Sequence, residues 1–139
     1  LVWQEARSGL FVIRQSDRWP NGWTEPVDVS DPTADARLAF TAPNSKGMFQ
    51  FLWAEGALIK HRVRHGAPQG VWWPPEVACV THTSLSELAG VISPTDDILH
   101  TVFCTYANGA GRQFYHVQRR TVDQKKVLLP FIASDTTRN

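Results

Sequence analysis

The chain has 139 residues, which is long enough for one sizeable hydrophobic core. Hydrophobic residues make up 42% of it and charged residues 19%, a balance that indicates an ordered globular protein rather than a disordered one. The formal net charge of +1 gives no electrostatic reason to expect nucleic acid or a membrane as a partner, and the apolar runs are too short to span a bilayer.

Short apolar runs separated by turn-forming residues follow one another along the whole chain. In chain order they occupy residues 1–5, 10–16, 23–30, 36–47, 51–55, 58–65, 72–79, 87–97, 101–106, 113–120 and 127–134, with turn-forming residues at the ends of 36–47 and 87–97. They are rich in Val, Ile, Phe, Thr and Trp, so each is predicted to be a β-strand. Residues 84–90 have the Ser and Glu spacing of a helix capping box, but we expect a loop entering a strand there.

The runs repeat with a period of about fifty residues. Trp3, Trp53 and Phe103 lie fifty residues apart, each in an apolar run that is followed by two further runs. Four short antiparallel strands at this period are typical of a β-propeller blade, whereas a β-sandwich, the alternative fold, has no such period. We therefore predict an all-β partial propeller of about three blades, at 1–30, 31–83 and 84–135, with the three aromatic residues buried at equivalent positions.

The hairpin that follows residues 10–16 resembles the Asp-box repeat of sialidase-type propellers. Ser16, Asp17, Gly22 and Trp23 match that motif loosely. Weaker copies keep Gly70, Trp73, Pro74 and Pro75 in the second unit, and Thr121 and Asp123 in the third, where Leu128 replaces the Trp. The resemblance implies a framework role, in which the carboxylate and hydroxyl bind backbone N–H groups across the turn and the Trp packs under the next blade. It also favours a secreted or extracytoplasmic protein.

In a propeller of this type, two sets of loops form the binding face, and polar side chains on them are the candidate ligand-binding residues. These candidates are Glu5, Arg7, Asp31, Asp35, Arg37, Glu55, His82, Glu87, Asn108 and Arg112. The resemblance implies a clamp of three Arg for a carboxylate, because guanidinium groups match carboxylates bidentately, and Arg7, Arg37 and Arg112 are the residues available for it.

A complete active site does not follow from the sequence. Tyr106 is expected near the binding face and Tyr115 in the packing, and neither forms a recognisable Tyr–Glu pair. Glu5 and Glu55 occupy equivalent places after the repeated Trp; hydrogen bonding at strand ends is the favoured interpretation, and a glycosidase carboxylate pair is the alternative.

Neither a metal site nor any other cofactor is expected. His61 and His65, four residues apart on a strand, would lie about 13 Å from each other and could not share an ion. The alternating Lys60, Arg62 and Arg64 are expected on a solvated outer face. Cys79 and Cys104 lie in apolar runs, which indicates two buried thiols, although a disulfide is possible in a secreted protein.

These patterns predict a sialidase-like propeller module that binds carbohydrate and is not itself an enzyme. The alternatives are a fragment of a sialidase-type glycoside hydrolase and a structural or protein-interaction propeller. Three blades do not close a ring, and the first unit begins at its second strand. We therefore expect the chain either to self-associate or to be a piece of a longer propeller.

Overall fold

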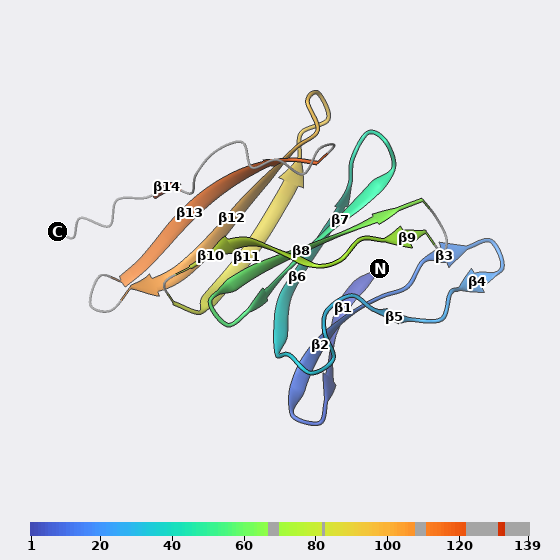
Figure 1. Ribbon diagram of the computed structural model, residues 1–139, viewed down its shortest axis with the longest axis horizontal. Coiled ribbons are helices and arrows are strands. Elements are labelled where there is room, and N and C mark those ends of the chain that lie inside the picture. The colour runs from blue at the N-terminus through green and yellow to red at the C-terminus, as the bar shows by residue number, and fades with distance from the viewer. Residues whose placement is uncertain (67–69, 82, 108–110, 122–130, 133–139) are drawn as a thin grey trace.

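The computed structural model describes residues 1–66, 70–81, 83–107, 111–121 and 131–132 (Figure 1). Over these residues the chain is all-β, and the described part contains no helix. Its strands form several antiparallel sheets, none of which is closed into a barrel. The predicted fold class is therefore confirmed at the level of all-β structure.

Three larger sheets follow one another along the chain. The first sheet contains β1 (Val2–Arg7), β2 (Leu10–Gln15) and β5 (Val27–Asp28), in that order. The second contains β6 (Ala36–Pro43), β7 (Met48–Glu55), β8 (Leu58–His65) and β10 (Glu76–Val80), with β9 (Val71–Trp72) paired to the far end of β8. The third contains β11 (Leu85–Ile92), β12 (Ile98–Ala107), β13 (Gly111–Arg120) and β14 (Phe131–Ile132). A separate hairpin joins β3 (Arg18–Trp19) to β4 (Gly22–Trp23).

Each predicted run that lies within the described residues overlaps a strand, but the run 72–79 is divided between β9 and β10. Strands that pair in a sheet follow one another in the chain, except that β3 and β4 lie between β2 and β5, and β9 lies between β8 and β10. The segment that mimics a capping box is not helical, as expected, but the strand β11 already begins at Leu85, where a loop entering a strand was predicted. The hairpin of β3 and β4 was not predicted as strands, because a two-residue strand is too short to show a period.

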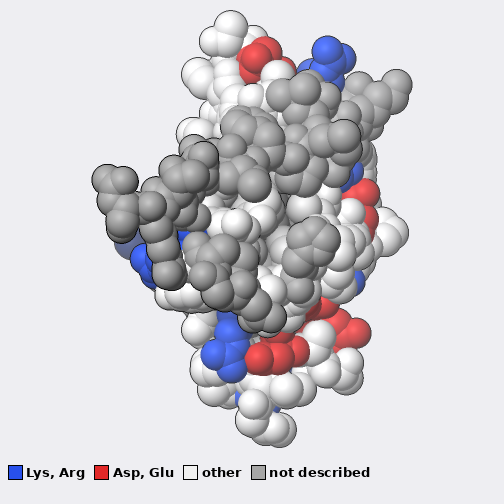
Figure 2. Space-filling model, turned by 90° about the vertical axis from the view of Figure 1, so that its left-hand side faces the viewer, with Lys and Arg blue, Asp and Glu red and all other residues white. Residues whose placement is uncertain are grey.

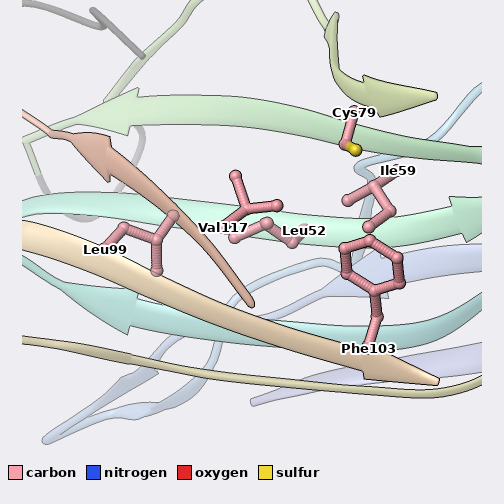
Figure 3. Packing of buried hydrophobic residues seen from close by; sticks show 6 residues of the cluster. All are labelled: Leu52, Ile59, Cys79, Leu99, Phe103 and Val117. Carbon is pink, nitrogen blue, oxygen red and sulfur yellow. The ribbon is translucent and has the colours of Figure 1, made fainter. Parts of the chain in front are cut away.

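The middle sheet is buried on both sides, and β7 shows how. Alternate residues of a strand point to opposite faces, so Phe51 and Trp53 face the first sheet and Leu52 faces the third. The first interface is formed by Ile13, Val29, Ala36, Phe51 and Trp53. The second is formed by Leu52, Ile59, Cys79, Leu99, Phe103 and Val117 (Figure 3). Each large apolar side chain buried in this way contributes about 1.5–3 kcal/mol to folding.

Polar contacts between turns join the second and third sheets at one end. The Asn44 side-chain amide donates to Thr121 Oγ1 at 3.1 Å, and Ser45 N donates to Asp97 Oδ1 at 2.7 Å. The Ser45 hydroxyl also donates to the Asp97 carboxylate. Because these bonds connect residues far apart in the chain, they fix the sheets relative to each other.

The first and third sheets each have an outer face that is turned away from the second sheet. Strand register places Trp3, Glu5, Arg7 and Arg14 on the outer face of the first sheet, opposite the side where Ile13 is packed. It places Val91 and Val102, which are 62% and 42% exposed, on the outer face of the third sheet.

Figure 2 shows the side of the molecule that lies at the left of Figure 1, where basic and acidic side chains are interspersed among the described residues.

The burial predicted for the three repeated aromatic residues is right for two of them. Trp53 and Phe103 are buried, and each faces the preceding sheet. Trp3 is only half-buried, which corrects the prediction. Trp3 points in the equivalent direction, away from the second sheet, and the Arg14 guanidinium lies 5.9 Å from its ring.

Candidate functional site

A cavity of about 410 Å³ lies where the first and second sheets meet. We call it the inter-sheet pocket; its lining residues are Gln15, Thr24, Glu25, Val27, Arg64, Gly70 and Trp72. It is at the ends of β2 and β8 that are remote from the β1–β2 and β7–β8 turns, in the region of β5 and β9 in Figure 1. An aromatic wall with a few polar groups is typical of small-molecule sites.

The buried Arg64 forms the floor of this pocket. Its side chain is 2% exposed and lies 4.9 Å from the Phe49 ring and 5.6 Å from the Trp72 ring. Its two terminal nitrogens donate to the Asp17 carboxylate at 2.5 and 3.0 Å, and one of them also donates to Gln15 Oε1 at 3.0 Å. A bidentate ion pair satisfies a guanidinium that would otherwise be costly to bury. The pair joins the first two sheets.

The hairpin that resembles an Asp box forms one rim of the pocket. The Ser16 hydroxyl donates to Thr24 O at 2.7 Å, and Thr24 N donates to Asp17 O at 2.9 Å. Asp17 N donates to Thr24 Oγ1 at 3.0 Å. The turn is thus held by Ser16 and by the backbone of Asp17. The Asp17 carboxylate differs from the expectation, since it binds Arg64 in the next sheet rather than backbone N–H groups of its own turn.

The Trp residues expected to pack under the next blade do not do so. Trp23 is 55% exposed, and Trp73 is also exposed. Trp72 packs instead, with its ring 5.0 Å from that of Phe51. Adjacent residues on an extended strand point to opposite faces, so the sequence WW gives one packed and one exposed ring, and the prediction chose the wrong one. Trp19, in β3 of the same hairpin as Trp23, is also exposed.

The three Arg proposed as a carboxylate clamp lie apart. Arg7 is on the outer face of the first sheet, where it donates to Glu5 at 2.7 Å and to Asp28 at 3.0 Å. Arg112 is on the outer face of the third sheet, where it donates to Glu87 at 2.7 Å and to the Tyr106 hydroxyl at 3.1 Å. With the second sheet between them, these two guanidinium groups cannot bind one carboxylate.

Arg37, the third member of that clamp, also has partners of its own. It donates to the Asp35 carboxylate at 3.0 Å, and its guanidinium lies 4.5 Å from the Phe11 ring. Asp35 in turn accepts a hydrogen bond from Phe11 N, which lowers the pKa of its carboxyl group. These residues brace the β1–β2 hairpin against β6, and the structure does not assemble the clamp.

Glu5 and Glu55 do not form a carboxylate pair. Glu5 faces outward from the first sheet and binds Arg7 and Arg14, and these hydrogen bonds lower its pKa. Glu55 is on the opposite side of that sheet, where it accepts a hydrogen bond from Trp53 Nε1 at 2.7 Å. The favoured interpretation, hydrogen bonding near strand ends, agrees with these contacts.

The remaining candidates take no part in the pocket. The Asp31 carboxylate accepts hydrogen bonds from Thr33, and these lower its pKa. Glu87 forms an ion pair with Arg112. Tyr115 stacks on Phe103 at 5.2 Å, as expected for a residue in the packing, and Tyr106 is exposed. His82, Asn108, Asp123 and Leu128 lie outside the described residues.

The segment carrying His61 and His65 forms the strand β8, as predicted, but the face that bears its Arg side chains is not a solvated outer face. The Arg62 guanidinium donates to Val29 O of the first sheet at 2.9 Å, and Arg64 is buried. The prediction was wrong because β8 lies inside a sheet that is covered on both sides, so its charged residues serve the interface. Long side chains on such a strand reach polar groups of the neighbouring sheet.

On its other side, β8 contributes a buried His61 between the second and third sheets. Its ring nitrogens lie 2.8 Å from Gln50 Oε1 and 2.9 Å from Glu76 Oε1, and Arg119 of the third sheet binds the same carboxylate. Burial lowers the pKa of His61. His61 has no access to solvent, so this chain of contacts is a connection between sheets rather than a reactive centre.

The pocket residues Glu25, Arg64 and Trp72 were not singled out as ligand-binding residues by the sequence. Each was placed in a run or repeat, and no local signal shows that sheet packing brings them together. Cys79 and Cys104 are both buried thiols that form no disulfide, which agrees with the favoured prediction.

Over the described parts of the chain, no group of His, Cys, Asp or Glu is arranged to hold a metal ion. The same residues include no helix of the length and apolarity needed to cross a membrane. No protein-family model, curated protein or solved structure matches the chain.

Proposed function

We propose that the chain is a sialidase-like β-propeller module that binds carbohydrate in the inter-sheet pocket. The propeller assignment is supported by the repeated plan of the three larger sheets. Each is antiparallel, each is built from strands in chain order, and consecutive sheets pack face to face. This is the arrangement expected of propeller blades.

The observation that carries the ligand class is the combination of groups in the pocket. Trp72 offers an aromatic wall, and Thr24 and the exposed Glu25 add polar groups to the lining. Gln15 also lines the pocket, but it is 4% exposed and its amide binds Arg64 and Asp17. Sugars present apolar C–H faces and many hydroxyl groups, so they are held by aromatic stacking together with carboxylate, amide and hydroxyl partners. Trp19 and Trp23 on the adjoining hairpin enlarge the exposed aromatic surface.

The alternative of a sialidase-type hydrolase has less support. The Arg clamp is not assembled, and the Tyr106 hydroxyl is engaged by Arg112 rather than by a carboxylate. We therefore propose binding without turnover.

A glycan array tests the proposal, followed by titration of each hit with tryptophan fluorescence as the signal. Glu25→Ala is the informative variant, because Glu25 is exposed and its removal leaves the interface intact. We expect it to weaken binding at least several-fold. Glu87→Ala, a change of another exposed Glu on the third sheet, is the matched control and should bind like the wild type. Failure of the wild-type chain to bind any glycan would contradict the proposal.

A structural or protein-interaction role is the second candidate, and the outer faces favour it. Val91 and Val102 are exposed on one of them, and the half-buried Trp3 lies on the other. We propose that a further sheet of the same kind covers each face, from a second copy or from the remainder of a longer propeller. Light scattering tests whether a second copy supplies the covering sheet. A dimer of the 15.6 kDa chain would support this, and a stable monomer at all concentrations would contradict it.

A further inference from the structure

The charges around the inter-sheet pocket limit which sugars it can accept. Arg64 is the cationic side chain among its described lining residues, and only 2% of that side chain is exposed. Its terminal nitrogens are directed at Asp17 and Gln15. The positive charge is therefore neutralised inside the protein and is not presented to a ligand.

Glu25 has the opposite character. It is exposed on the rim, and none of the described hydrogen bonds or ion pairs engages its carboxylate. A carboxylate in this state accepts hydrogen bonds from hydroxyl groups and repels a second carboxylate held within a few ångströms. The charge facing a ligand in this pocket is thus negative.

From these two observations we infer that the pocket takes uncharged pyranosides and discriminates against sugars that carry a carboxylate, including sialic acids and uronic acids. The inference rests on the proposed carbohydrate-binding function and assigns its ligand class. It runs against the expectation of an Arg clamp, because the Arg64 guanidinium at the pocket already holds the carboxylate of Asp17.

Matched pairs of sugars test the inference on the complete chain. Methyl glucoside and methyl glucuronide differ only in a hydroxymethyl group and a carboxylate at C6, and the galactose pair differs in the same way. N-Acetylneuraminic acid completes the set. In whichever pair of glycosides binds, we expect the neutral sugar to bind about tenfold more tightly than the corresponding uronide at low ionic strength. This difference in affinity should become smaller as salt is added.

Glu25→Gln provides the second measurement, since it removes the charge while keeping the size and a hydrogen-bonding oxygen. We expect this variant to bind the uronide better than the wild type does, closing most of the tenfold gap. Equal or tighter binding of an acidic sugar by the wild-type chain would overturn the inference and leave the proposed function standing. If no member of the set and no array glycan binds, the proposed function itself fails.

Discussion

The ion pair between Arg64 and Asp17 should be the polar contact on which the first interface depends most. Asp17→Ala leaves the guanidinium, 2% exposed, without the carboxylate that accepts two of its hydrogen bonds. Removing one partner of a buried pair typically costs about 3–5 kcal/mol. Because Asp17 is 18% exposed, we expect the lower end of that range, about 3 kcal/mol.

The converse change should be much milder. Arg64→Met removes the charge and keeps a long side chain between Phe49 and Trp72, while the partly exposed Asp17 carboxylate can be hydrated. We expect a cost of about 1 kcal/mol, and the double variant should be more stable than Asp17→Ala alone. Asp28→Ala is the matched control, since Asp28 likewise accepts two hydrogen bonds from arginine, one each from Arg7 and Arg14, but on the outer face, where ion pairs contribute about 0–1 kcal/mol.

Urea unfolding followed by tryptophan fluorescence measures these differences, with the six Trp residues as the probe. If Asp17→Ala costs no more than Asp28→Ala, or if Arg64→Met costs more than Asp17→Ala, the pair is not a buried connection between the sheets and the reasoning is wrong.

Three other predictions concern the interfaces and the activity. A Cβ atom at Gly90 would lie 3.0 Å from both His100 O and Phe40 Cε1. Gly90→Val should therefore destabilise the chain by about 1–3 kcal/mol, as measured by urea unfolding. Ala89→Val, on the exposed face of the same strand, is the control and should change stability little. Burial lowers the pKa of His61 in the folded chain, so the unfolded chain binds the imidazole proton more tightly, and the free energy of unfolding should fall as pH decreases below about 6.5. His61→Gln should reduce this dependence of stability on pH above about pH 5, and an unchanged dependence would contradict the prediction. The chain should not hydrolyse a fluorogenic sialoside, and turnover lost in Arg37→Ala but kept in Asp17→Ala would place an active site on the loops first predicted.

The all-β fold could be predicted because its signals are local. Runs such as 51–55 and 58–65 are short, β-branched or aromatic, and bounded by turns, and these properties determine strands without reference to the rest of the chain. The fifty-residue period then indicated which strands belong together. Even Trp3, wrongly expected to be buried, points in the predicted direction.

The pocket could not be predicted, because it depends on which side of each strand is covered. In β8 the alternation of basic residues with His and Val looks like a solvated face, but the second sheet is covered on both sides. Because the sequence does not show which side of a strand is covered, Trp73 was predicted to pack in place of Trp72. For the same reason, Arg7 and Arg112 were predicted to belong to one clamp. Sheet packing, rather than any motif, brings Glu25 and Trp72 to a single cavity.

The indole N–H resonances of the Trp residues offer the most direct test of the central claim, that a glycan occupies the inter-sheet pocket. Two-dimensional NMR spectra resolve such signals, and Trp→Phe variants assign them. On titration with a neutral glycoside that binds, we predict that the resonance of Trp72, in the pocket wall, shifts in proportion to occupancy. That of Trp3, on the outer face of the first sheet, should stay in place. A shift of Trp3 with Trp72 unmoved, or no shift of either at saturating sugar, would contradict the claim.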